Sequence, residues 1–477
     1  MYFPRMKRIL MVLVFSVSFS CIQAQQPDSS GWAAEVDARL EQWMETFEVP
    51  GVAIIGWEQG VVIDTLVRGW ADQDRSIPLS ASHRFPLGRL TQSLTAVGVL
   101  KLAAEGSVKL DLPVNTYLNR WEVSEGPYNP GDVTPRGLLS HTGGINAWPD
   151  KWAQTDTASL IARLEGKGAY PEVSIRHRPG AAYRYAAAGY LILQLMLEDV
   201  TGMTYPAFMQ DSLFASLDVP APAFTLPEEW AAFPHDRHGR SRSMVIHPPS
   251  QAGSGAWMSP LDLSRFWLVL YQTQDSTYQK VLRQLQRPQV TLRNLGTRRN
   301  NPQYTFGFFR EMLPDSTALL YMTSKVEPGW YAQVYLHPHS KSGLMLMANG
   351  RNAAPVLNRM VSIWSTRNDW PAPHLVNRHF WGEYAARAIS VVILLLAGYL
   401  GFWLYQSRTQ RTFRSGTSMW QVIILVFWSV LTALFLFFAA PMLEDWLPWM
   451  YPGVLLPLLV YLLLLLLWIL FPRRGTP

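Results

Sequence analysis

Cysteine is nearly absent from the sequence, which contains a single one, Cys21, among 477 residues. A chain with one cysteine forms no internal disulfide, so its folded part must be stable through core packing alone. The chain is longer than one ordinary domain and is sufficient for a large buried core.

A dense basic stripe is also missing, although the net charge is +6. Much of the positive excess lies in arginines that flank apolar runs near the C-terminus, so the sequence predicts no nucleic-acid partner. Two histidine pairs, His235 with His238 and His337 with His339, lack a helical i, i+4 spacing and a third ligand nearby. We therefore expect no metal site and no cofactor.

Residues 1–24 are typical of a secretory signal peptide, because Lys7 and Arg8 precede an apolar run and then a region of small residues. Cleavage after Ala24 fits this pattern. Attachment of a lipid to Cys21 is the alternative, although residues 18–20 match a lipid-attachment box poorly.

Three long apolar runs lie near the C-terminus, at 388–405, 419–440 and 449–471. Each is close to the roughly 20 residues that a helix needs to cross a bilayer. They predict three membrane-spanning helices over 388–472, joined to the preceding domain by a linker over 369–387. The runs contain no Lys, Asp or Glu, so we interpret them as an anchor or helix-association module and not as a transport pathway.

The charges between these runs predict the orientation of the chain. The first loop and the C-terminal end are basic, whereas the second loop is acidic (Arg408, Arg411, Arg414, Arg473 and Arg474; Glu444 and Asp445). Since positively charged loops stay in the cytoplasm, three crossings place the domain at 30–368 outside and the C-terminus inside. The predicted location is the cytoplasmic membrane, in agreement with the signal peptide.

The exported domain is predicted to mix strands and helices. Short apolar or alternating runs punctuated by glycine at 49–56 and 60–64 predict two antiparallel strands. One helix is predicted to begin at Arg89, and the glycines at 143–144 end another one just after His141. We therefore interpret His141 as structural.

Residues 85–96 read Phe-Pro-Leu-Gly-Arg-Leu-Thr-Gln-Ser-Leu-Thr-Ala. This segment resembles the active-site entry of the serine β-lactamase and penicillin-binding-protein superfamily, in its class C β-lactamase, esterase and D-aminopeptidase branch. The pattern there is Phe-x-x-Gly-Ser-x-x-Lys-x-x-Thr-Ala. Further segments resemble the same family in the same order (49–56, 106–118, 133–145, 179–190 and 251–266).

The resemblance covers about residues 35–365. It implies an α/β (α+β) domain in which an antiparallel sheet is flanked by helices and a helical region is inserted between strands. The pocket is expected beneath the start of the Arg89 helix.

The catalytic residue types of that family are replaced in this chain. Arg89 stands at the serine position and Gln92 at the lysine position. A guanidinium is no nucleophile, and an amide takes up no proton at neutral pH, so neither supplies the lost chemistry. None of the lysines has a serine three residues earlier, and no Gly-x-Ser-x-Gly elbow occurs.

Two further motifs of the family are altered. Its Tyr-x-Asn motif reads Tyr185, Ala186, Ala187 here, so the tyrosine is retained and the amide is lost. The Pro-Gly-Trp-Tyr anchor at 328–331 predicts that residues 323–325 replace the strand motif Lys-Thr-Gly. The predicted pocket lining is therefore Arg89, Gln92, Tyr185, Thr323, Ser324 and Lys325.

The altered residues leave several interpretations open. Arg89 is either a solvated side chain that fills a closed pocket or a bidentate grip for a carboxylate or phosphate. Tyr185 is either a core aromatic residue or a retained site residue. Ser93 as a replacement nucleophile is disfavoured, because no lysine or histidine stands at a helpful offset.

Two functions follow as hypotheses. The first is a membrane-anchored, catalytically silent relative that binds or regulates, with a peptidoglycan-type peptide or a neighbouring envelope protein as its partner. The alternative is an active hydrolase of peptide, ester or β-lactam bonds that uses a rearranged site. The backbone N–H at position 89 is retained as an oxyanion donor, but without a nucleophile or base it supports only weak catalysis, so the first is favoured.

Overall fold

A computed structural model describes residues 32–146, 158–167, 171–227, 229–244, 250–292 and 301–377. The predicted signal peptide at 1–24 and the predicted spans at 388–472 lie outside these ranges. Among the residues described, no helix combines the length and the apolar character that a bilayer crossing requires.

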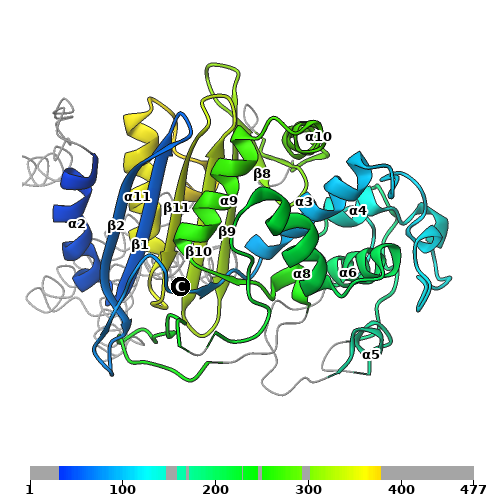
Figure 1. Cartoon of the computed structure of the whole chain (residues 1–477), viewed down its shortest axis with the longest axis horizontal. Coiled ribbons are helices and arrows are strands. Elements are labelled where there is room, and N and C mark those ends of the chain that lie inside the picture. Colours follow the sequence, from blue (N-terminus) through cyan, green and yellow to red (C-terminus); the bar gives the residue numbers. More distant parts are fainter. Residues whose placement is uncertain are drawn as a thin grey trace, which may run out of the picture.

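In the described part of the chain, nine strands form one antiparallel sheet in the order β3-β2-β1-β11-β10-β9-β8-β7-β6 (Figure 1). The strands are β1 (Gly51–Glu58), β2 (Val61–Asp72), β3 (Ile77–Pro78), β6 (Val290–Thr291), β7 (Gln303–Tyr304), β8 (Phe309–Met312), β9 (Ala318–Val326), β10 (Trp330–His337) and β11 (Ser342–Ala348). A separate small sheet pairs β4 (Phe85–Pro86) with β5 (Trp257–Met258). The strands predicted at 49–56 and 60–64 are confirmed as β1 and the start of β2.

The helices fall on both faces of the sheet and into a helical region beside it (Figure 1). They are α2 (Trp32–Thr46), α3 (Leu90–Ala104), α4 (Pro135–Leu139), α5 (Leu160–Leu164), α6 (Ala187–Thr201), α7 (Tyr205–Ala207), α8 (Gln251–Ser254), α9 (Pro260–Gln272), α10 (Ser276–Gln286) and α11 (Ala354–Arg367). Short helical turns also occur at Val114–Thr116, Pro130–Asp132, Phe208–Phe214 and Ala215–Leu217. The α+β domain implied by the resemblance is confirmed.

Successive side chains of the strands point to opposite faces of the sheet, and the apolar core is therefore divided into two clusters. In β1, Val52 and Ile54 pack with α2 and α11, whereas Ile55 and Trp57 belong to the larger cluster on the opposite face. Successive side chains of a strand point to opposite faces, so both faces of a central strand are apolar when both are covered.

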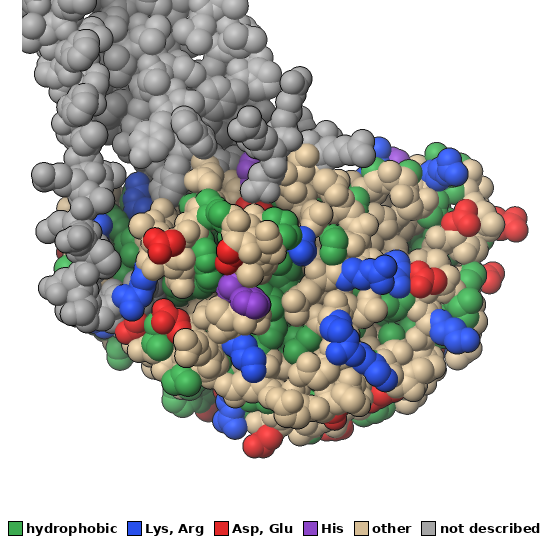
Figure 2. All heavy atoms as spheres, turned by 90° about the horizontal axis from the view of Figure 1, so that it is seen from above, with side chains coloured by type: hydrophobic (Ala, Val, Ile, Leu, Met, Phe, Trp, Pro, Cys, Tyr) green, Lys and Arg blue, Asp and Glu red, His purple; other side chains and the backbone are tan. Residues whose placement is uncertain are grey.

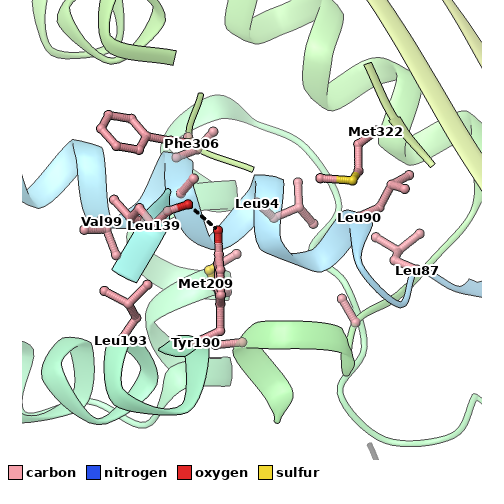
Figure 3. Packing of buried hydrophobic residues seen from close by; sticks show 14 of the residues in the cluster. Leu87, Leu90, Leu94, Val99, Leu139, Tyr190, Leu193, Met209, Phe306 and Met322 are labelled. Atoms are coloured by element: carbon pink, nitrogen blue, oxygen red, sulfur yellow. Dashed lines mark hydrogen bonds between the residues drawn. The ribbon is translucent and has the colours of Figure 1, made fainter. Parts of the chain in front are cut away.

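Helix α3 runs through the larger cluster and carries Arg89 at its start. Twelve of its residues are buried, so this helix is enclosed by the domain over most of its length. Figure 3 shows Leu90 and Leu94 of α3 among side chains from other elements, including Met322 of β9. The same view shows the Tyr190 hydroxyl donating to the Leu139 carbonyl at 3.1 Å.

The first part of the predicted linker packs against the domain. Trp370 packs against His337 with ring centroids 4.3 Å apart and ring planes tilted by 46°, and the buried Glu311 carboxylate accepts the His374 backbone N–H at 2.8 Å. Burial raises the pKa of Glu311. The chain is therefore fixed to the sheet up to about residue 377, and the rest of the linker lies outside the described residues.

The described surface bears charges of both signs. On the face in Figure 2, basic side chains are scattered and acidic ones lie among them.

Candidate active site

The start of α3 is held against strand β9 by the turn before it. Gly88 has a φ of +50°, and a Cβ at this position would lie 2.3 Å from Ser324 Oγ and 2.5 Å from Val326 Cγ2. Only glycine fits here, because any other side chain would separate the turn from the strand. The turn is fixed on its other side by the Leu87 N–H, which donates to the Ala256 carbonyl at 2.8 Å.

This approach joins the backbone of residue 89 to the strand. The Arg89 N–H donates to Ser324 Oγ at 2.9 Å, and Ser324 is buried. The sequence predicts the N–H of residue 89 as a donor for an oxyanion. In the structure this N–H already donates to the hydroxyl of Ser324.

One helical turn further on, the Gln92 side chain connects two ring residues. Its Nε2 donates to the Tyr185 hydroxyl at 3.0 Å, and its Oε1 lies 3.2 Å from His141 Nε2. The Ala186 N–H donates to His141 Nδ1 at 3.3 Å, so Nδ1 is unprotonated and Nε2 carries the proton that Gln92 accepts. The tautomer and the amide orientation follow from this network.

His141 is neutral within this arrangement. Its side chain is buried, and its backbone adopts the left-handed region with a φ of +56°. Burial lowers the pKa of His141 to about 3, with a further contribution from the positive charge of Arg89. Such a weak base takes no proton from a hydroxyl at neutral pH.

The Arg89 side chain is exposed and lies over an aromatic ring. Its guanidinium carbon is 4.6 Å from the centroid of the Tyr185 ring, within the range of a cation–π contact. Tyr185 thus contacts both Arg89 and Gln92.

A family model described as Beta-lactamase matches residues 36–361, which is more than half of the chain. The chain belongs to the β-lactamase family.

Curated relatives and solved structures agree with this membership. Protein flp of Staphylococcus aureus is 21% identical over 326 residues, which are 66% of this chain and 62% of that protein. Esterase EstB of Burkholderia gladioli is 29% identical over 251 residues, 48% of this chain and 62% of that protein. The chain therefore spans less than two thirds of the length of these relatives.

Two solved structures share the fold. A penicillin-binding protein homologue from Pyrococcus abyssi, described as octameric, aligns with a TM-score of 0.60 and 19% identity over 71% of this chain and 78% of that one. A class C β-lactamase from Rhodobacter sphaeroides aligns with a TM-score of 0.57 and 17% identity over 70% and 98%. At these identities the likeness establishes the fold alone.

Strand β9 places one of the three predicted residues at the site. Ser324 faces α3, on the same side of the sheet as Met322 and Val326. Lys325 lies on the other face, where its Nζ is 5.7 Å from the centroid of the Tyr331 ring. Thr323 shares that face because side chains alternate along a strand.

Of the three predicted residues, Ser324 therefore contacts the start of α3. The assignment of residues 323–325 to the family's third motif stays a prediction.

Ala187 and Ser93 supply no chemistry at the site. Ala187 is the first residue of α6, and its buried methyl group stands where the family has an amide. The Ser93 hydroxyl is buried and donates to the Gly307 carbonyl at 2.6 Å. A backbone carbonyl accepts this hydrogen bond but does not take up the proton, so the contact does not activate Ser93 as a nucleophile.

His141 is the site residue that sequence reasoning assigned to a structural role. Its ring contacts Gln92, Tyr185 and also Tyr304, whose centroid is 5.3 Å away. The signal was its place in a Leu-Leu-Ser-His-Thr segment close to a signature of the family, whereas no sequence pattern pointed to Tyr304. Among the residues that the structure describes, no group of three or more His, Cys, Asp or Glu side chains is placed to hold a metal.

The neutrality of His141 predicts a specific dependence of stability on pH. Its pKa of about 3 lies below the ordinary 6.5, so the unfolded chain takes up a proton that the folded chain does not as the pH falls below 6.5. Stability from this group is complete above pH 6.5 and declines toward pH 4. In His141→Gln, the slope of the unfolding free energy against pH should be smaller by up to about 1.4 kcal/mol per pH unit.

Urea unfolding of the full chain in detergent, followed by tryptophan fluorescence between pH 4 and 7, measures this slope. The variant His238→Gln, at an exposed histidine outside the network, is the control for the removal of one imidazole from the chain. An unchanged slope in His141→Gln would contradict the assignment of a neutral, buried ring.

Proposed function

We propose that this protein is a membrane-anchored, catalytically silent member of the β-lactamase family that binds a ligand or regulates a partner in the cell envelope. The observation that carries the proposal is the Gln92 amide, held between His141 and Tyr185 in the place of the family's lysine. The amide itself takes up no proton at neutral pH, and its partner His141, with a pKa of about 3, is too weak a base to activate a nucleophile.

Hydrolysis by a rearranged site is the second candidate. One relative is an esterase by name, and several structures with the same fold are β-lactamases. The candidate needs a new nucleophile, for which the Ser324 hydroxyl, bonded to the Arg89 backbone, is available. Against it, His141 is a weak base with a pKa of about 3 and would not activate a hydroxyl at neutral pH.

Covalent probes distinguish the two candidates. We expect no labelling of the full chain by a fluorescent penicillin or a fluorophosphonate, since both require an activated serine. In another serine hydrolase, removal of the nucleophile lowers turnover about a millionfold, so a silent site should remain at background.

An active serine β-lactamase treated in parallel verifies the probes. Stoichiometric labelling that disappears in Ser324→Ala or Ser93→Ala would overturn the proposal and identify the nucleophile.

The engaged backbone N–H predicts which substitutions restore activity. The variant Arg89→Ser, Gln92→Lys, Ala187→Asn restores the side chains of the first two motifs, but Ser324 still occupies the donor that an oxyanion requires. We expect esterase activity to rise only when Ser324→Gly is added, because glycine removes the hydroxyl and opens the strand to substrate.

Hydrolysis of p-nitrophenyl acetate measures the gain. Adding Thr323→Gly in place of Ser324→Gly is the matched control, because it inserts a glycine in the same strand on the opposite face. Equal activity with and without Ser324→Gly would show that the hydroxyl does not block the site.

Membrane anchoring is part of the proposal and is supported by the apolar runs at 388–405, 419–440 and 449–471. In a bacterial host, the full chain should remain in the membrane fraction after an alkaline carbonate wash. Protease added to spheroplasts should digest the domain at 30–368 and leave the basic C-terminus protected. Recovery in the soluble fraction, or protection of the domain, would contradict the predicted orientation.

A further inference from the structure

The start of β2 exposes a run of apolar side chains, at one side of the sheet (Figure 1). Val61, Val62 and Ile63 are 64%, 42% and 42% exposed, although all three are large hydrophobic residues. Single exposed apolar residues are common on a protein surface, whereas a run of three marks a contact with another molecule or with lipid.

A bulge in β2 contributes to this exposure. Gly56 of β1 pairs with Asp64, but the next residue, Trp57, pairs with Val62, so Ile63 is the extra residue of the bulge. A bulge interrupts the alternation by which every second side chain of a strand is buried. Both faces of the strand therefore present apolar side chains to the surroundings at this point.

Three turns lie together at this end of the sheet. The Gly60 N–H donates to the Lys341 carbonyl at 2.9 Å, which joins the turn between β1 and β2 to the turn between β10 and β11. At the end of β10, His337 Nε2 lies 2.7 Å from Thr317 Oγ1 in the turn between β8 and β9. The exposed run and the end of β8 are therefore at the same end of the molecule.

The described chain also ends here. The backbone N–H of His374 is bound by Glu311 near the end of β8, and Asn377, the last residue described, follows three positions later. Ten residues, 378–387, then precede the first predicted membrane span at 388. Such a tether reaches about 40 Å at most, and only when fully extended.

The length of the sheet decides which end faces the membrane. Strand β2 has 12 residues. At about 3.3 Å per residue, the opposite end of the sheet lies about 40 Å beyond the exposed run. That end would reach lipid only on a fully stretched tether, so a relaxed tether leaves the end with residues 61–63 next to the bilayer.

A lipid surface fits this run better than a second copy of the chain. Pairing of two copies along the edge of β2 would cover backbone groups and leave both faces of the strand exposed, whereas a bilayer interface surrounds both faces. The charges nearby have both signs, since Glu58 lies 3.8 Å from Arg367 and Lys341 is exposed. Asp64 follows the run directly, so the contact is limited to the interface and does not extend into the hydrocarbon.

We propose that residues 61–63 contact the lipid surface and orient the domain, so that this end of the sheet faces the bilayer. A short tether keeps the surface at a high local concentration, and three apolar residues then suffice for a contact that would be weak in a free domain. This inference rests on the proposed function, because it requires the anchor at 388–472.

The orientation has a consequence for the candidate active site. Ser324 lies six positions after Ala318, the residue at which β9 leaves the membrane-facing end. This spacing corresponds to about 20 Å along the strand. The site is therefore held away from lipid and is open toward the envelope.

Quenching by lipid tests the contact. The full chain with Cys21→Ser is placed in nanodiscs that contain a nitroxide-labelled lipid, and an environment-sensitive fluorophore is attached at Ile63→Cys or Ile77→Cys. Ile77 is the matched control, because it is a similarly exposed isoleucine (38%) that pairs with the opposite end of β2. We expect quenching at 63 to exceed that at 77 about twofold or more, since only the former lies at the interface.

Polar substitutions test the apolar nature of the contact. Val61→Thr with Val62→Thr should reduce the quenching at residue 63, because threonine keeps the branched shape of valine and adds a hydroxyl. Leu261→Thr, at an exposed leucine of α9, is the control and should leave the quenching unchanged. Unfolding temperatures of the variants exclude loss of folding as the cause.

Equal quenching at residues 63 and 77 would overturn the inference, as would quenching at 63 that survives the threonine substitutions. Shielding of the label at 63 in detergent that increases with protein concentration would assign the surface to a second copy. Failure here is distinguishable from failure of the proposed function. A chain that resists the carbonate wash without extra quenching at 63 is anchored but lacks this contact, and the penicillin probe reports on catalysis alone.

Discussion

The close approach of the turn at Gly88 to strand β9 is the constraint on which the site depends. A Cβ at Gly88 would overlap Ser324 and Val326, so the chain reaches the strand only with glycine at this position. Helix α3, buried over most of its length, then fixes the direction in which the site residues leave the backbone. The contacts of Arg89 with Ser324 and of Gln92 with His141 follow from this one placement.

Burial determines which residue of the site carries charge. Gln92 is fully buried between His141 and Tyr185, both neutral there, and an ammonium at that depth would need a compensating anion. An amide has one donor side and one acceptor side, which match these two partners. The family pattern places its cation at this buried position, whereas this chain places it one helical turn earlier at the exposed Arg89. The positively charged residue of this chain is therefore at a more exposed position than the lysine of the family pattern.

Sequence patterns over a few residues predicted the strands and the helix start that form the site. The strands near 49–64, the helix that begins near Arg89 and the substituted positions at 89 and 92 were readable because glycine punctuation and residue spacing act over a few residues. The contact of His141 with Gln92 was not predicted, because it joins segments 49 residues apart. The sequence did not indicate which of residues 323–325 contacts α3, because the motif's glycine, which would mark its register, is absent, and one step along a strand exchanges its two faces.

The substituted residues of the site satisfy one another's hydrogen bonds. Random substitution at buried polar positions leaves donors and acceptors without partners, each at a cost of about 1–3 kcal/mol. In the described residues, none of the buried side-chain atoms that lack a hydrogen bond belongs to Arg89, Gln92, His141, Tyr185 or Ser324. The Ser324 hydroxyl occupies the donor left by the lost chemistry, and Gln92 satisfies the tyrosine and the histidine together. Replacements that satisfy one another's hydrogen bonds indicate a site that is stable in its altered form, because random substitution has no requirement that the new residues agree with one another.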